Sequence, residues 1–149
     1  MAAGPGYSRL LGSHYDLADS IHATNPGDSV IGDHATRPWG SWTVLDEGAG
    51  FKVKRISVAP AQRLSYQTHE HRAEHWTVVA GRATCVIDDS VLVLRSGESV
   101  RVDIGQAHRI TNEEDEVLVL IEVQLGAYCE EDDICRLQDD YGREASVTQ

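Results

Sequence analysis

Four side chains in the middle of this chain are of the kinds that bind divalent metal ions. Gln67 and His69 are two residues apart, Glu74 follows five residues after His69, and His108 lies further along the chain. Residues two apart on a β-strand point to the same face, so one strand can present both Gln67 and His69. Two imidazoles, a carboxylate and an amide oxygen suit Zn(II), Mn(II), Fe(II), Co(II) or Ni(II), and they leave coordination positions open for water or a substrate.

Glycines at regular distances place these residues in two spaced motifs. The motif positions are Gln67, His69, Glu74 and Gly81, then Gly97, Gly105, His108 and Asn112. The spacings resemble the two cupin motifs, whose usual forms are G-x5-HxH-x3,4-E-x6-G and G-x5-PxG-x2-H-x3-N. Ala61, Gln67 and Asp103 stand where the family has Gly, His and Pro. The resemblance implies a β-barrel with one divalent metal ion held by the four side chains named above.

A second register of the first motif leaves one alternative open. His69 and His71 would then form the HxH pair, but only two residues would separate the pair from Glu74, which is shorter than the family pattern. We favour the register that starts at Gln67. It places His71 on the pocket face of the same strand, and it places His75 on the face opposite to Glu74.

Short β-type segments recur along the chain, with Gly, Asp and Ser between them. The predicted strands are 41–45, 51–58, 63–69, 75–79, 83–87, 91–94, 99–102, 108–111 and 116–124. Turn signals separate most of them. Many short, evenly spaced strands predict an all-β protein, which here is a cupin double-stranded β-helix, or jelly-roll barrel.

The two ends of the chain differ from this pattern. Residues 1–35 show little periodicity and are predicted to form an N-terminal extension, in which only 15–23 has a weak helical pattern. The cupin domain is expected to occupy residues 36–149, with a short acidic C-terminal helix over 130–138. Because cupins of this size commonly pair through N-terminal segments, the extension favours a homodimer.

Composition limits the possible partners and surroundings. The net charge of −11 argues against nucleic acid and against anionic membrane surfaces. A local group of Arg and Lys can still bind a phosphorylated ligand, because charges are screened over about 8–10 Å. No apolar segment approaches the ~20 residues that span a bilayer. Three cysteines without a CxxC pair indicate neither a disulfide framework nor a thiolate zinc site, and we expect a cytoplasmic protein.

Longer strings make the resemblance more specific. RPWG at 37–40 and RAEHW at 72–76, with further strings across residues 36–143, are similar to the cupin domain of type II mannose-6-phosphate isomerases. That domain usually follows a mannose-1-phosphate guanylyltransferase, whose Gly-rich nucleotide loop is missing here, so guanylyl transfer is expected to be absent. The resemblance implies a metal-dependent isomerase that interconverts mannose 6-phosphate and fructose 6-phosphate through a cis-enediol.

Within that reading, His71 and Lys54 are the candidates for proton transfer. An imidazole titrates near neutral pH, and the favoured register places His71 on the pocket face. Lys54 lies on a central predicted strand and is also a candidate to contact the phosphate.

Arg72, Arg109 and Arg37 are the candidates for substrate binding, because a guanidinium binds phosphate with two hydrogen bonds. Strand alternation weakens the case for Arg109, which should face away from His108, and Arg37 can instead anchor the RPWG turn. Two alternatives stay open. One is another metal-dependent cupin enzyme, either a dioxygenase or a sugar isomerase or epimerase with a different substrate. The other is a sugar-binding cupin without catalysis.

Overall fold

The computed structural model describes residues 31–143, which form strands, turns and loops and contain no helix. The strands are β1 (His34–Arg37), β2 (Gly40–Gly48), β3 (Phe51–Val58), β4 (Tyr66–Thr68), β5 (Arg72–Ala80), β6 (Arg82–Ile87), β7 (Ser90–Arg95), β8 (Ser99–Val102), β9 (His108–Thr111), β10 (Leu118–Gly126) and β11 (Cys135–Gln138). The all-β prediction is therefore confirmed. No described segment is a helix that could cross a membrane.

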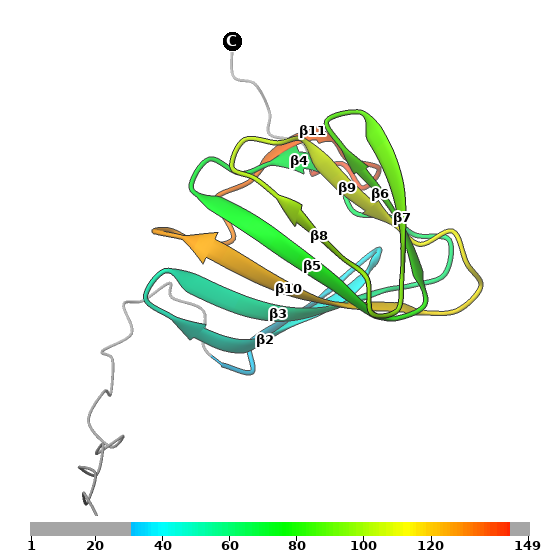
Figure 1. Ribbon diagram of the computed structural model, residues 1–149, viewed down its shortest axis with the longest axis horizontal. Coiled ribbons are helices and arrows are strands. Elements are labelled where there is room, and N and C mark those ends of the chain that lie inside the picture. The colour runs from blue at the N-terminus through cyan, green and yellow to red at the C-terminus, as the bar shows by residue number, and fades with distance from the viewer. Residues whose placement is uncertain (1–30, 144–149) are drawn as a thin grey trace, which may run out of the picture.

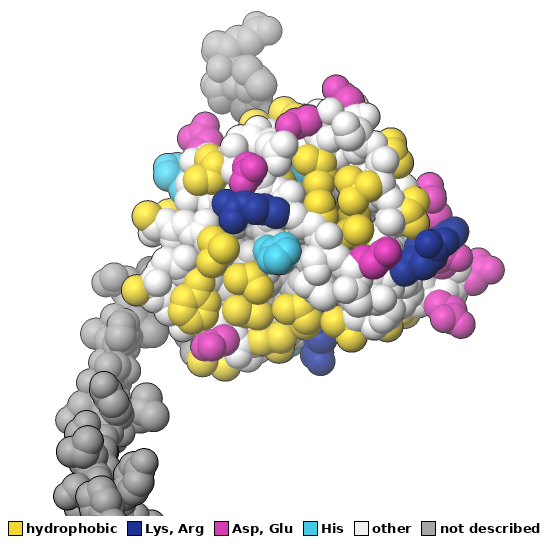
Figure 2. Space-filling model, in the orientation of Figure 1, with side chains coloured by type: hydrophobic (Ala, Val, Ile, Leu, Met, Phe, Trp, Pro, Cys, Tyr) yellow, Lys and Arg dark blue, Asp and Glu magenta, His cyan; other side chains and the backbone are white. Residues whose placement is uncertain are grey.

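The strands form two antiparallel sheets, which are the two walls of a barrel (Figure 1). One sheet has the order β1-β2-β3-β10-β5-β8, and the other has the order β11-β4-β9-β6-β7. The end strands β1 and β11 come from opposite ends of the described chain. On the face shown in Figure 2, acidic side chains are scattered and Lys and Arg occur in small separate groups. This distribution agrees with the negative net charge.

Side chains that point into the barrel change from apolar to polar along the strands. On β10, Leu118 and Leu120 are buried, and the next two inward residues, Glu122 and Gln124, are buried as well. The inward side chains of the neighbouring strand β3 become polar at the same height, because Lys54 is opposite Glu122 in the ladder. Thirteen residues form the apolar cluster: Trp39, Ile56, Val58, Trp76, Val78, Ala83, Cys85, Ile87, Leu94, Val102, Ile110, Leu118 and Leu120. The interior thus has an apolar end and a polar end.

The C-terminal helix predicted over 130–138 is wrong. Residues 135–138 instead form β11, which pairs with β4 and places Arg136 opposite Gln67. Asp133 fixes the preceding turn, because its carboxylate accepts the backbone N–H groups of Glu70 and His71. The acidic residues before β11 have a composition that favours a helix, but they form a loop here. The edge of β4 then supplies the backbone hydrogen-bond partners of β11.

The N-terminal boundary also differs in detail from the prediction. His34 and Ala35 belong to β1, which pairs with β2, so the strand pattern begins just inside the predicted extension. The rest of the predicted arm up to residue 30, with its weak helix at 15–23, lies outside the described residues, as do residues 144–149.

The one motif glycine that this chain replaces lies at a position with a positive φ. Ala61 stands where the first cupin motif has Gly, and its φ of 55° lies in the left-handed region. A residue with a Cβ is disfavoured there by about 1–2 kcal/mol. The turn before β4 therefore has a left-handed residue at this motif position without a glycine there.

Candidate metal centre

His69, Glu74 and His108 converge at the polar end of the barrel. All three are buried, and their possible ligand atoms lie within 4.8 Å of one another. The distance from His69 Nε2 to Glu74 Oε1 is 3.0 Å, and that from His108 Nε2 to Glu74 Oε2 is 3.7 Å. Ligand atoms at about 2.1 Å from one ion, at right angles, are about 3 Å apart. The spacing is therefore close to that of a metal site.

Each imidazole is oriented by its other ring nitrogen. Nδ1 of His69 donates a hydrogen bond to the Asp133 carbonyl oxygen, and Nδ1 of His108 donates one to the Gln106 carbonyl oxygen at 2.8 Å. A neutral ring with its proton on Nδ1 keeps a free lone pair on Nε2, which is how metal-binding histidines are usually held. Nε2 of His108 is buried and has no hydrogen-bond partner among residues 31–143. The residues present therefore fit a divalent ion.

The charge states at this cluster also suit a metal. Burial by itself would raise the pKa of Glu74, but the neighbouring His69, His108 and Arg72 outweigh this effect and hold that pKa well below its usual range. Burial lowers the pKa of His108, which favours the neutral ring. An ionised carboxylate and a neutral imidazole are the forms that bind a metal ion.

Gln67 lies beside the cluster with its amide nitrogen toward it. Nε2 of Gln67 is 3.4 Å from Nε2 of His69, while its Oε1 accepts a hydrogen bond of 2.6 Å from the Ser65 hydroxyl. A half-turn of the amide brings its oxygen to the cluster, and the Ser65 hydroxyl can then accept instead of donate. Gln67 can thus join as a fourth ligand without moving its backbone.

A pocket opens next to the cluster, on the side of Gln67 and Glu74. It is lined by Arg37, Trp39, Trp42, Lys54, Ile56, Leu64, Ser65, Gln67, Arg72, Glu74, Glu122, Gln124, Glu131, Ile134, Arg136 and Arg143. Three of the sequence candidates other than metal ligands, Arg37, Lys54 and Arg72, are among these residues. The pocket therefore combines part of the candidate metal cluster with several positively charged side chains and two indole rings.

Two charged residues face each other across strands on the pocket wall. Lys54 of β3 pairs with Glu131 and lies 4.4 Å from the ring centre of Trp42. Glu122 of β10 is opposite Lys54, and it accepts hydrogen bonds from Trp76 Nε1 at 3.2 Å and from Gln124 Nε2 at 2.7 Å. Burial, followed by the negative charge of Glu74, raises the pKa of Glu122 to about 7.

Glu122 was not among the sequence candidates. The available signal was the alternation of β10, where Leu118, Leu120, Glu122 and Gln124 all fall on one face. An acidic residue on the inward face of a strand that begins with buried leucines is a candidate for a site. The spacing motifs do not include this strand, so they gave no indication of it.

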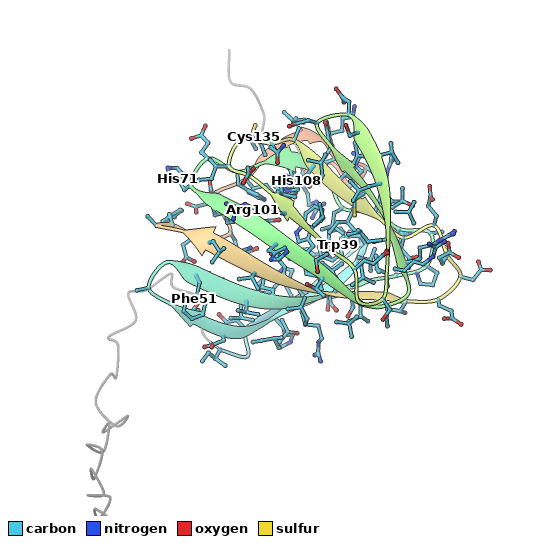
Figure 3. The ribbon with its side chains drawn as sticks, in the orientation of Figure 1. Trp39, Phe51, His71, Arg101, His108 and Cys135 are labelled. Atoms are coloured by element: carbon cyan, nitrogen blue, oxygen red, sulfur yellow. The ribbon has the colours of Figure 1, made fainter. Side chains whose placement is uncertain are left out.

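His71 does not point into the pocket, contrary to the prediction. Its side chain is 57% exposed, and Nδ1 lies 3.0 Å from Asp133 Oδ1. Figure 3 shows it at the edge of the barrel, while His108 lies between the sheets. Strand β4 ends at Thr68 and the chain bends at residues 70 and 71, so the alternation that predicted the orientation of His71 stops before it.

Arg109 also lies away from the pocket. Its guanidinium is 5.7 Å from the ring centre of Tyr66 and donates a hydrogen bond to the Gln138 carbonyl oxygen. It faces away from His108, as strand alternation predicted. His75 is exposed on β5, opposite in orientation to the buried Glu74, also as predicted. Arg109 therefore has no access to a ligand in this pocket.

Comparison with known proteins gives a consistent picture of the family. The family model described as "Mannose-6-phosphate isomerase C-terminal" matches residues 27–139. Alginate biosynthesis protein AlgA of Pseudomonas aeruginosa is 50% identical over 109 residues, which is 73% of this chain and 23% of AlgA. Mannose-1-phosphate guanylyltransferase of Escherichia coli is 48% identical over 127 residues, 85% of this chain and 27% of that protein. The chain spans about a quarter of the length of these relatives.

Solved structures give the fold. The cupin domain of Schizosaccharomyces pombe Cnp3 aligns with a TM-score of 0.54 and 12% identity, covering 58% of this chain and 64% of that one. A Cupin 2 conserved barrel domain protein of Salinispora arenicola aligns with a TM-score of 0.52 and 27% identity, covering 58% and 75%. The two-sheet barrel is thus a cupin double-stranded β-helix, as the sequence predicted.

Proposed function

Because this chain belongs to the family of mannose-6-phosphate isomerase C-terminal domains, we propose that it is a metal-dependent isomerase that interconverts mannose 6-phosphate and fructose 6-phosphate. The observation that carries the proposal is the buried cluster of His69, Glu74 and His108 beside an open pocket with basic side chains. The chain spans about a quarter of the length of the matched relatives, so its activity is proposed here and tested by the assay below.

The chemistry required agrees with this arrangement. An aldose-to-ketose shift moves a proton between C1 and C2 while negative charge gathers on oxygen. A divalent ion, when bound, supplies Lewis-acid stabilisation of that charge. His69, Glu74 and His108 would hold the ion, with Gln67 as the fourth ligand. Sequence and structure leave Zn, Mn, Fe, Co and Ni as candidates, since these donor types serve all five.

Proton transfer is assigned to the pair that faces the pocket. Lys54 and Glu122 are neighbours across β3 and β10, and both line the pocket. A group that moves a proton must come within hydrogen-bond reach of the substrate, which excludes His71 in the described arrangement. Trp39 and Trp42 line the same space with apolar indole rings.

A coupled assay for fructose 6-phosphate tests the proposal. The full chain is stripped with a chelator, restored with each of the five ions in turn, and given mannose 6-phosphate. We expect turnover to return with at least one ion and to fall by more than 100-fold in His69→Ala and His108→Ala. His75→Ala is the matched control, since it removes an exposed imidazole next to Glu74. If the protein binds one ion per chain and shows no turnover with any of them, the isomerase proposal is overturned.

Two further expectations accompany this function as proposals. A homodimer is expected from the N-terminal segment, and a cytoplasmic location is proposed because the three cysteines show no pattern typical of a disulfide framework. Sedimentation of the full chain and of a variant that lacks residues 1–30 tests the first expectation. A monomer at high concentration for the full chain would contradict it.

A further inference from the structure

Three arginines line one wall of the pocket. Arg37 lies on β1, Arg136 lies on β11, and Arg143 follows shortly after β11. Strands β1 and β11 are the end strands of the two sheets, so the arginines come from opposite ends of the described chain. Only Arg37 was a sequence candidate. The tertiary structure thus produces a cluster of positive charge that no motif contains.

Arg136 has a buried donor without an acceptor. It is directly opposite Gln67 in the β11–β4 ladder, and residues directly opposite each other project to the same face. Its neighbours on the strand, Cys135 and Leu137, are exposed on the other face. Nε of Arg136 is buried, with no hydrogen-bond partner among the described residues. A buried, unpaired donor of this kind destabilises a protein by about 1–3 kcal/mol, and more when it is charged.

Two other arginines lie near Arg136, together with acidic residues. Burial lowers the pKa of Arg136, and the positive charges of Arg143 and Arg37 lower it further, against the opposing effect of acidic neighbours such as Asp139. Arg143 is held in place by Asp139, with Nη2 to Oδ1 at 2.6 Å and Nε to Oδ2 at 3.1 Å. Within residues 31–143, no carboxylate lies within ion-pair distance of Arg37 or Arg136. The wall therefore carries unbalanced positive charge.

The other positive side chains of the pocket are balanced. Lys54 pairs with Glu131, and Arg72 donates to Glu74 at 3.2 Å. The surplus positive charge therefore lies on the pocket wall formed by Arg37, Arg136 and Arg143. Part of this wall is β11, the strand next to Gln67 on β4. An incoming anion is directed to this wall rather than to the carboxylates of the metal cluster.

We propose that Arg37, Arg136 and Arg143 form the binding subsite for a phosphomonoester dianion. The inference rests on the proposed function and deepens it by naming the residues that recognise the phosphate. Guanidinium groups bind phosphate oxygens with paired, charge-assisted hydrogen bonds, and the free Nε of Arg136 is one such donor. The subsite holds the phosphate while the sugar extends along Gln67 to the metal cluster. The same subsite selects a phosphorylated sugar over a free one.

Phosphate binding without a metal ion tests the subsite separately from catalysis. Inorganic phosphate is titrated calorimetrically into metal-free His69→Ala protein at low ionic strength, so that a bound ion cannot account for the signal. We expect one site per chain. Affinity should fall at least tenfold when Arg136→Gln or Arg37→Gln is added, and less when Arg136→Lys is added. Arg101→Gln is the matched control, because Arg101 is exposed, pairs with Asp103 and lies outside the pocket (Figure 3).

Turnover then separates the two proposals. If the isomerase is active, Arg37→Gln should raise KM for mannose 6-phosphate at least tenfold and change kcat less. Arg37 is exposed, so this variant should melt like the wild type. Phosphate that does not bind, or that binds equally well to the Arg136 and Arg37 variants, overturns the subsite even if turnover persists. Saturable binding that is lost with Arg136, in a chain without turnover, supports the subsite and overturns only the isomerase.

Discussion

The two ends of the barrel interior are built from the same strands but from different chemistry. At one end, Val58 of β3 and Leu118 of β10 are opposite each other and fully buried. Four residues away on each strand, Lys54 and Glu122 occupy the equivalent inward positions and are also buried. Burial of apolar groups stabilises the fold, whereas burial of charges is compensated only by pairing and hydrogen bonds. The apolar end therefore supports the structure, and the polar end carries the site at a cost in stability.

The largest effect is expected at the apolar end. Leu120→Ala removes a fully buried side chain and should lower the free energy of unfolding by about 2–5 kcal/mol, because it leaves a cavity. Urea unfolding measures the change. The folded fraction should still bind a divalent ion with unchanged stoichiometry. A loss of less than about 1 kcal/mol in the free energy of unfolding would show that the apolar end is not the main source of stability.

Metal binding should stabilise the polar end. Adding an ion at 100 times its dissociation constant should raise the free energy of unfolding by about 2.7 kcal/mol. The gain should disappear in His108→Ala and persist in His75→Ala, as measured by thermal melting with and without the ion. An equal gain in His108→Ala would show that the ion binds elsewhere.

Glu122 should make the metal-free protein less stable as pH rises. Its pKa is raised from 4.5 to about 7, so between these values the folded state keeps a proton that the unfolded state has released. Stability that is present at low pH is therefore lost as pH rises through this window, by on the order of 2 kcal/mol. Denaturation from pH 5 to pH 8 should show a smaller fall in Glu122→Gln. Glu116→Gln, at an exposed position, should behave like the wild type, and identical curves for all three proteins would contradict the assignment.

The smallest effect is expected outside both ends. Ala61→Gly relieves the positive φ at the turn before β4 and should stabilise the protein by up to about 1 kcal/mol, reduced by the greater freedom of Gly in the unfolded chain. Urea unfolding measures this change, and metal affinity should stay the same. Destabilisation by more than about 0.5 kcal/mol would mean that the Ala61 methyl group makes a contact worth more than the strain.

Much of this fold could be predicted from local patterns. The strands 99–102 and 108–111 were predicted with their observed bounds, because alternation and turn residues are short-range signals. The convergence of His69, Glu74 and His108 followed from motif spacing. The predicted orientation of His71 was wrong because the same alternation was extended past the end of β4. The prediction of a helix over 130–138 was wrong because pairing with the edge of β4 and the hydrogen bonds of Asp133 outweigh local helix propensity.

Local spacings were enough to predict the barrel and the donor set of the candidate metal centre, because both depend on distances within a strand or between neighbouring turns. The set of charged residues that share the pocket depends instead on how the strands are arranged in space. Glu122 reaches it because β10 lies between β3 and β5, and Arg37 and Arg136 reach it because the end strands of both sheets border the same opening. Such contacts depend on strand order, and strand order is set by the packing of the whole chain rather than by any one segment.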